Sequence, residues 1–155
     1  MTALVVYDSF FGNTEKIAKA MSDALAGSKL VRAGDVRPSD VQPVDLLIVG
    51  SPTRGFRASP NTNAFIQSIP ADGLHGKKVA VFDTRMPEKD VGRGVRFIMK
   101  MGGYAASKMA DALKKKGGEL VTTPEGFFVV DREGPLKDGE LERAAKWAQT
   151  VSGSD

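Results

Sequence analysis

The sequence predicts an α/β protein in which helices cover both faces of a parallel β-sheet. Residues 3–7, 44–50 and 78–83 are strongly apolar runs, which are typical of strands buried on both faces. A segment with helical spacing of its apolar residues follows each of them. Strands that alternate with amphipathic helices indicate a parallel sheet, because each helix carries the chain back to the same end.

The first helix is predicted at residues 14–26, where apolar side chains recur three and four positions apart. These side chains are Ile17, Ala18, Met21 and Leu25. Asn13 or Thr14 is a suitable N-cap, since both side chains can accept a backbone N–H. Residues 29–33 are expected to form a short second strand. The polar residues 34–43 contain two prolines, so we expect a connection with at most a helical turn.

The middle of the chain contains the third and fourth strands, at residues 44–50 and 78–83, with a helix at 61–69 between them. Residues 84–103 are predicted to be a long connection. Loops of that length are uncommon in compact domains and usually have a function. This one is rich in basic residues, so it is a candidate part of a binding site.

The last part of the chain contains two helices and an interrupted strand. Helices are predicted at residues 104–116 and 139–151, the second with Leu141 on its apolar face and Trp147 sealing the core. The fifth strand is expected in two pieces, 119–122 and 126–130, because Thr123-Pro124-Glu125 interrupts the apolar pattern.

Composition limits the functions that this chain can have. It has 155 residues, which suits a single domain spanning residues 1–155. It has no cysteine and one histidine, which excludes disulfides, thiol catalysis and a histidine cluster for a metal. The net charge of +3 is too small to indicate nucleic-acid binding, and no apolar run could span a membrane. No export signal precedes the first strand, so we expect a cytoplasmic protein.

Three loops at the carboxyl ends of strands form the candidate site: residues 8–14, 51–60 and 84–103. They converge if the strand order is 2-1-3-4-5, because ligands of such sheets bind beyond the carboxyl ends of the strands. The first loop offers the side chains of Ser9, Asn13 and Thr14, and Gly12 allows close approach of the backbone. The following helix start adds free N–H groups, so the loop is predicted to bind a phosphate.

Three familiar phosphate sites do not match this loop. A nucleotide-binding P-loop requires a glycine-rich stretch ending in Gly-Lys-Ser or Gly-Lys-Thr, and no lysine precedes Thr14 here. The dinucleotide fingerprint Gly-x-Gly-x-x-Gly is also absent after the first strand. A phospho-receiver domain has an acceptor aspartate where the third strand ends, and this chain has Gly50-Ser51-Pro52.

The first loop resembles the phosphate-binding signature of the flavodoxin family. The matching positions are Val5, Val6, Tyr7, Ser9, Gly12, Thr14 and Ala18, and Met21 stands where the family has an aliphatic residue. The resemblance implies a flavodoxin-like three-layer sandwich of the short-chain form, with a five-stranded parallel sheet of order 2-1-3-4-5. It also implies an FMN cofactor, whose single phosphate can be held without a lysine.

The resemblance implies roles for sixteen residues. The side chains of Ser9, Asn13 and Thr14 would hold the phosphate, with backbone N–H groups of Phe10, Phe11 and Gly12. The flavin ring would be flanked by Ser51, Pro52, Thr53, Arg54, Gly55 and Phe56, and its pyrimidine edge by backbone groups of Asp83, Thr84, Arg85 and Met86. No catalytic or metal-binding residue is implied. An ordinary helix cap at Asn13 or Thr14, and packing of Phe56 under its own loop, are the structural alternatives.

The loops around the expected flavin depart from the family pattern. Flavodoxins that carry electrons usually have acidic surroundings and an aromatic residue after the fourth strand, whereas this chain has Thr84-Arg85-Met86-Pro87 there. Basic residues predominate in both loops: Arg54, Arg57, Arg85, Lys89, Arg93, Arg96 and Lys100. Positive surroundings stabilise the anionic reduced flavin, so we expect a less strongly reducing site and an acidic or anionic partner.

Three functions are compatible with these features. The first is FMN-dependent electron transfer to a redox partner protein or a small acceptor. The second is an FMN-dependent reductase that acts on a quinone-like acceptor with NAD(P)H. The third is a module that keeps the fold but has weak or lost flavin binding, which the missing aromatic residue suggests.

Overall fold

The computed structural model describes residues 2–53, 57–87 and 105–153. Its strands are β1 (Ala3–Tyr7), β2 (Lys29–Arg32), β3 (Leu46–Pro52), β4 (Lys78–Arg85), β5 (Glu119–Leu120) and β6 (Glu125–Phe128). Its helices are α1 (Asn13–Ala24), α2 (Pro38–Val41), α3 (Pro60–Ser68), α5 (Ala105–Lys115) and α6 (Glu140–Ser152), with a 3-10 turn η1 (Ala33–Asp35). The strand order is β2-β1-β3-β4-β5, and β6 also pairs with β4. The order predicted from the sequence is therefore confirmed.

The fifth position of the sheet is filled by two short strands. β5 pairs with the start of β4, where Lys78 lies beside Glu119. β6 pairs with the end of β4, where Asp83 lies beside Gly126 and Thr84 beside Phe127. All of these pairings are parallel. The predicted interruption is thus confirmed, and β6 supports the carboxyl end of β4, which carries candidate site residues.

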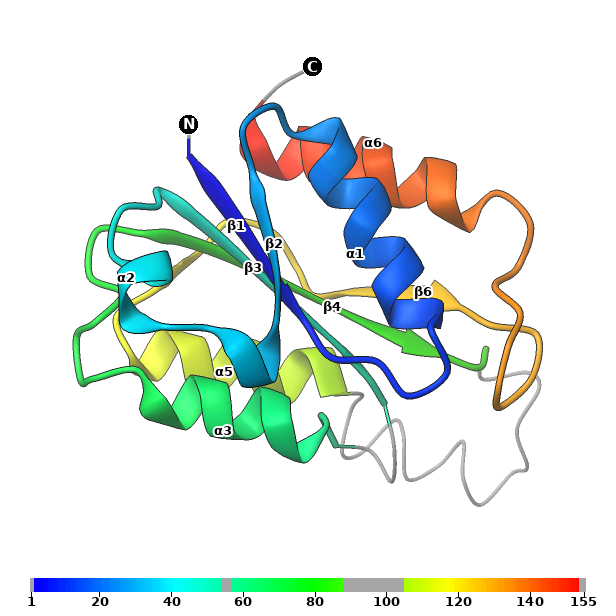
Figure 1. Ribbon diagram of the computed structural model, residues 1–155, viewed down its shortest axis with the longest axis horizontal. Coiled ribbons are helices and arrows are strands. Elements are labelled where there is room, and N and C mark those ends of the chain that lie inside the picture. Colours follow the sequence, from blue (N-terminus) through cyan, green and yellow to red (C-terminus); the bar gives the residue numbers. More distant parts are fainter. Residues whose placement is uncertain (1, 54–56, 88–104, 154–155) are drawn as a thin grey trace.

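Helices cover both faces of the sheet and form two hydrophobic cores (Figure 1). On one face, Ile17 and Met21 of α1 and Ala144 of α6 pack against the sheet. On the other face, Phe65 of α3 and Leu113 of α5 do so. The fold class is therefore the three-layer α/β sandwich that the alternating pattern predicted.

Three aromatic rings on the α1–α6 face hold β4, β6 and α6 together. Phe82, Phe127 and Trp147 meet edge to face, with ring centroids 5.8 to 6.2 Å apart. Edge-to-face pairs are favourable because the positive rim of one ring meets the negative face of another. The predicted core role of Trp147 is confirmed.

Two local predictions are wrong. Helix α1 begins at Asn13 and its N-cap is Gly12, so neither Asn13 nor Thr14 is the cap. Leu141 was placed on the apolar face of α6, but 44% of its surface is exposed. The helix presents Ala144, Ala148 and Val151 to the sheet instead. Leu141 is the second residue of α6, so it keeps the apolar spacing but lies at the end of the helix, where solvent reaches its side chain.

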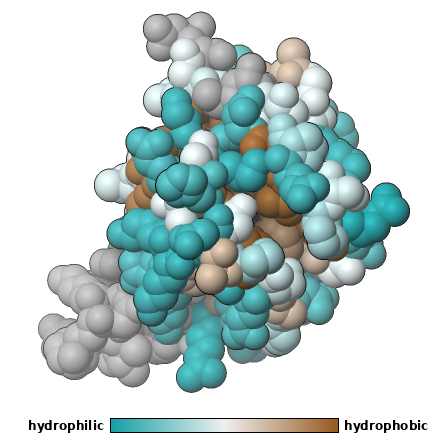
Figure 2. Space-filling model, turned by 90° about the vertical axis from the view of Figure 1, so that its left-hand side faces the viewer, coloured by the Kyte–Doolittle hydropathy of each residue, from teal (hydrophilic) through white to brown (hydrophobic). Residues whose placement is uncertain are grey.

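The amino ends of the strands lie at the end of the molecule opposite the candidate site. Figure 2 looks at this end and shows recessed hydrophobic surface surrounded by hydrophilic side chains. A pocket of about 180 Å³ lies between α2 and the end of α3, lined mainly by Val36, Pro38, Val41, Phe65, Ile69 and Pro70. Within the described ranges, no helix is long and apolar enough to cross a bilayer.

Candidate functional site

The loop between β1 and α1 is held by a buried carboxylate. Asp8 is 3% exposed, and its Oδ1 accepts hydrogen bonds from Ser9 N at 2.9 Å and from Arg32 Nη1 at 3.2 Å. The same Arg32 nitrogen donates to the Ser9 carbonyl oxygen at 3.2 Å. Arg32 also lies over the Tyr7 ring, with Cζ 5.3 Å from the ring centroid. The end of β2 therefore fixes the loop that leaves β1.

Gly12 turns this loop into the start of α1. Its φ of 90° lies in the left-handed region, which glycine adopts without steric cost. Ser9 Oγ accepts the Gly12 N–H at 3.0 Å, so the serine closes the loop onto itself. In the part of the chain that the structure describes, no side chain caps α1. The first N–H groups of the helix are therefore available to a ligand, as the anion-site hypothesis requires.

Thr14 connects the start of α1 to the end of β4. Its Oγ1 lies 2.8 Å from Thr84 Oγ1, and the two residues are only 1% and 6% exposed. Thr84 extends from the sheet toward α1, since it lies on the same side of β4 as Phe82. The first and third candidate loops are thus brought together, although Thr84 was expected to contribute only its backbone.

Asn13 contacts a segment that sequence reasoning did not include in the site. Its Nδ2 donates to the Glu133 carbonyl oxygen at 3.0 Å. Gly134 comes so close that an added Cβ would lie 2.6 Å from Asn13 Nδ2. The left-handed φ of 106° also requires glycine at Gly134. The pair Gly134-Pro135 predicts a turn from the sequence, but it does not indicate that this turn contacts Asn13.

Side chains at the end of β3 hold the loop that follows this strand. Ser51 is fully buried, and its Oγ accepts from Ser59 N at 2.9 Å and donates to the Pro52 carbonyl oxygen at 3.0 Å. Thr53 N donates to the Thr84 carbonyl oxygen at 3.1 Å, which ties this loop to β4. Thr53 Oγ1 accepts from Ala105 N at 3.3 Å, at the start of α5.

Asp83 faces α5 and is fully buried. Its Oδ1 accepts from Arg85 Nε at 2.5 Å, and its Oδ2 accepts from Ala106 N at 3.0 Å. Burial raises the pKa of the Asp83 carboxyl, and the nearby Arg85 guanidinium offsets only part of that effect. Arg85 crosses Gly126 of β6, where an added Cβ would lie 2.4 Å from its Cζ. These two side chains therefore tie the end of β4 to the start of α5 and to β6.

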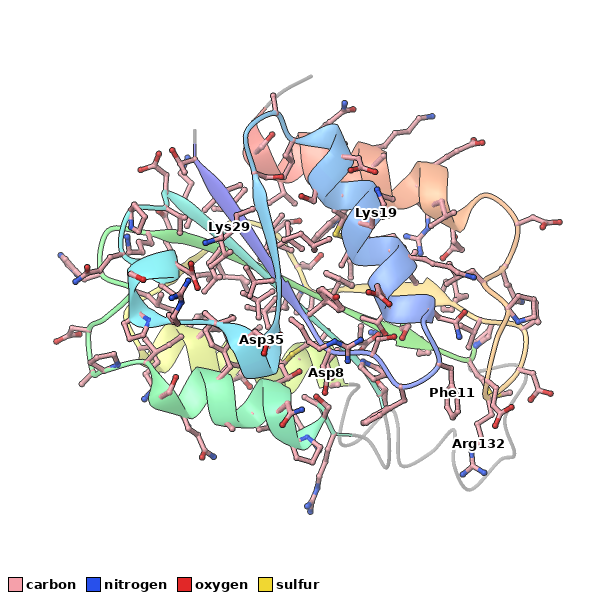
Figure 3. All side chains as sticks on the ribbon, viewed as in Figure 1. Asp8, Phe11, Lys19, Lys29, Asp35 and Arg132 are labelled. Atoms are coloured by element: carbon pink, nitrogen blue, oxygen red, sulfur yellow. The ribbon has the colours of Figure 1, made fainter. Side chains whose placement is uncertain are left out.

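Two aromatic side chains of the first loop are exposed. Phe10 and Phe11 expose 42% and 49% of their surfaces. In Figure 3, Phe11 and Arg132 extend from their two loops at the same end of the molecule. Met86 follows β4 and is half-buried. The expected flavin contacts of Arg54, Gly55 and Phe56, and the basic residues of 88–103, lie outside the described residues.

The geometry fits a phosphate monoester better than a metal ion. Around the uncapped start of α1, Ser9, Asn13 and Thr14 are all less than 10% exposed, yet their side chains are polar. Hydroxyl, amide and backbone N–H groups are donors, and donors bind anions. Among the described residues, no group of three or more His, Asp or Glu side chains gathers where it could hold a metal.

A family model described as "flavodoxin domain" matches residues 4–130. Comparison with curated protein sequences finds no match. Among solved structures, a flavodoxin from the domain Archaea is similar, with a TM-score of 0.76, 19% identity and coverage of 99% of this chain and 97% of that one. Flavodoxin 2 from Bacillus cereus has a TM-score of 0.74 and 22% identity, and 99% of both chains is covered.

A larger oxidoreductase contains a similar unit. Rubredoxin oxygen:oxidoreductase from Desulfovibrio gigas has a TM-score of 0.73 and 22% identity. The similarity covers 98% of this chain but 35% of that one. These structural similarities show a shared fold.

Proposed function

Because the chain belongs to the flavodoxin domain family, we propose that it binds FMN and transfers electrons to a redox partner protein or a small acceptor. The observation that carries this proposal is the uncapped start of α1, with the buried Ser9 and Thr14 beside it. A phosphate there would receive the first N–H groups of the helix, and the helix dipole would favour its negative charge.

The residues of this chain would bind and orient the cofactor. Ser9, Asn13 and Thr14 would hold the phosphate by their side chains. Phe10, Phe11 and Gly12 would add backbone N–H groups, the last by giving up its present hydrogen bond to Ser9 Oγ. The loops 51–56 and 83–86 would hold the ring, largely by backbone groups, since the Ser51 and Asp83 side chains are engaged elsewhere. Bound FMN supplies the redox chemistry, because it accepts and donates electrons singly or in pairs.

Flavin reconstitution tests this function. The apoprotein is titrated with FMN, FAD and riboflavin, and binding is followed by the change in flavin fluorescence. FMN is expected to bind at least about tenfold more tightly than riboflavin, which is the order expected for one or more hydrogen bonds to a charged phosphate. Equal affinities would show that the 9–14 loop is not a phosphate site. Absence of any flavin binding would instead favour the module that has lost the cofactor.

The charges around the site bear on the redox properties that we propose. Arg85 has its charge beside the buried Asp83 carboxylate, so it contributes less to a positive field than a solitary cation would. Arg57 is exposed. We propose that the basic loops still make the flavin less strongly reducing than an acidic carrier's, and that they favour an acidic or anionic partner. A redox titration showing a hydroquinone couple as negative as that of acidic flavodoxins would contradict this.

The alternative enzyme function differs in one measurable property. A reductase of the quinone type would be reduced directly by NAD(P)H, whereas a carrier requires a partner protein as electron donor. Anaerobic mixing of the FMN-loaded protein with NADH or NADPH distinguishes the two, because flavin reduction is visible as bleaching. Rapid bleaching would favour the reductase.

A one-domain organisation over residues 1–155 and a cytoplasmic location stay predictions.

A further inference from the structure

The hydroxyl pair of Thr14 and Thr84 leaves one buried proton without an acceptor. Two hydroxyl groups carry two protons, and their mutual hydrogen bond of 2.8 Å uses only one of them. Neither hydroxyl has another hydrogen-bond partner among the residues that the structure describes. With exposures of 1% and 6%, neither residue is well placed to give the remaining proton to bulk water. Buried donors are almost always satisfied, so this pair requires an acceptor.

The position of the pair indicates the direction of its hydrogen bond. Thr14 lies in the first turn of α1, at the helix end that attracts anions. Thr84 lies in β4 beside Phe127, one layer below that helix end. If Thr84 donates to Thr14, the free proton belongs to Thr14 and can point to a phosphate oxygen. The reverse direction would leave the free proton on the sheet residue and away from the helix start.

We infer that Thr84 is a positioning residue for the phosphate of the proposed FMN cofactor. Its hydroxyl donates to Thr14 Oγ1, and Thr14 in turn donates to a phosphate oxygen. A chain of hydrogen bonds that ends on a charged acceptor is strengthened by polarisation in a buried setting. The Thr84 side chain therefore contributes to phosphate recognition, in addition to the contact that its backbone is expected to make with the pyrimidine edge of the flavin. This inference rests on the proposed function.

Thr84 also links the loops on both sides of the site. Its carbonyl oxygen accepts the Thr53 N–H at 3.1 Å, while its hydroxyl bonds to Thr14. Among the described residues, Thr84 is thus the one that is hydrogen-bonded to both the 9–14 and the 51–53 segments. Only the hydroxyl bond is lost when its side chain is replaced by valine, because the backbone bond stays.

The test compares FMN with riboflavin in Thr84→Val, Thr84→Ser and the unmodified protein. Valine keeps the branched shape and removes the hydroxyl, whereas serine keeps the hydroxyl. Thr84→Val is expected to reduce the FMN-to-riboflavin affinity ratio about five- to tenfold, the size of one hydrogen bond to a charged group. Thr84→Ser is expected to retain most of the ratio. Because riboflavin shares the ring, a general loss of fold lowers both affinities and leaves the ratio unchanged.

A second hydroxyl pair in the chain provides the matched control. Thr62 Oγ1 lies 2.8 Å from Ser59 Oγ, and Thr62 is fully buried at the start of α3. Thr62→Val removes the same kind of bond at a helix start where no phosphate is proposed. It is expected to lower stability but to leave the FMN-to-riboflavin ratio within about twofold, since α3 and α1 pack on opposite faces of the sheet.

A double variant tests whether Thr84 acts on the phosphate through Thr14. If Thr84 acts through Thr14, then Thr14→Val alone and Thr14→Val/Thr84→Val together should reduce the ratio equally. An unchanged ratio in Thr84→Val, or independent and additive losses, would overturn the inference. If Thr84→Val does not fold, Thr84→Ala takes its place in the same comparison. Equal affinity of the unmodified protein for both flavins would overturn the proposed function instead.

Discussion

Glu140 and Arg143 join the start of α6 to β6, and their interaction is open to a quantitative test. Glu140 Oε2 accepts from Phe128 N at 2.8 Å and from Arg143 Nη2 at 2.7 Å, and its Oε1 accepts from Arg143 Nε at 2.9 Å. Arg143 also donates to the Gly126 carbonyl oxygen at 2.5 Å and lies over the Phe127 ring, 4.3 Å from its centroid. β6 supports the part of β4 that holds Thr84.

Glu140→Gln is expected to lower the free energy of unfolding by about 2 kcal/mol at pH 7. Hydrogen bonds to charged groups contribute about 1.5–3 kcal/mol each, but glutamine keeps one acceptor oxygen. Water also compensates Arg143 in part, because 37% of its side chain is exposed. For a chain of this size, about 2 kcal/mol corresponds to a fall in Tm of about 4–8 °C. Urea unfolding followed by far-UV circular dichroism measures the loss.

The same variant has a pH dependence of known sign. Burial opposes ionisation of Glu140, but hydrogen bonds from Arg143 and from the Phe128 N–H outweigh it, so the pKa of Glu140 is lowered. Its stabilising contribution is therefore present above the unfolded-state pKa of about 4.3 and is lost as pH falls through the folded-state value. The difference in stability between the original protein and Glu140→Gln should shrink below about pH 4.

The neighbouring Glu142→Gln is the control for charge at the helix start. Glu142 lies in the same first turn and is exposed. It has the same favourable interaction with the helix dipole, worth about 0.3–1 kcal/mol, but no bond to β6. If Glu140→Gln costs no more than Glu142→Gln, the network does not hold β6, and the reasoning from its distances is refuted.

Three further substitutions test the construction of the site. Gly134→Ala should lower FMN affinity and stability more than Gly139→Ala. Both glycines have a positive φ, but only the Cβ added at Gly134 would meet Asn13, at 2.6 Å. Equal losses for the two variants in melting and flavin titrations would argue against that contact. Arg32→Gln should weaken FMN binding about tenfold, because the Asp8 carboxylate beside the proposed phosphate loop then lacks a cation, whereas Lys19→Gln, which removes an exposed ion pair, should not. Identical titration curves for the two variants would exclude this role. Gly50→Ala should destabilise the fold by more than about 3 kcal/mol, because the new methyl group would lie 2.0 Å from the Phe82 ring, and near-normal urea unfolding would refute that packing.

Local patterns in the sequence were sufficient for the elements and their order. Apolar runs such as residues 46–49 are buried completely in the sheet, and the stripe of α1 faces it. These predictions succeeded because the apolar pattern of a segment predicts which of its faces is buried, whichever distant residues pack against that face. Helix ends were less predictable. Gly12 replaced Asn13 as the cap, since the loop needed a left-handed residue before the helix could start.

The sequence by itself determined that a polar, glycine-containing loop follows a buried strand and opens a helix, because those features depend on neighbouring residues. Only the tertiary structure decided which side chains meet there. Thr14 bonds to Thr84, 70 positions away, and Asn13 bonds to Glu133, 120 positions away. Strand order and register create these contacts, and they are long-range properties of the sheet. The tertiary structure likewise turned Asp83 toward α5 and Thr84 toward α1, since successive residues of a strand face opposite sides.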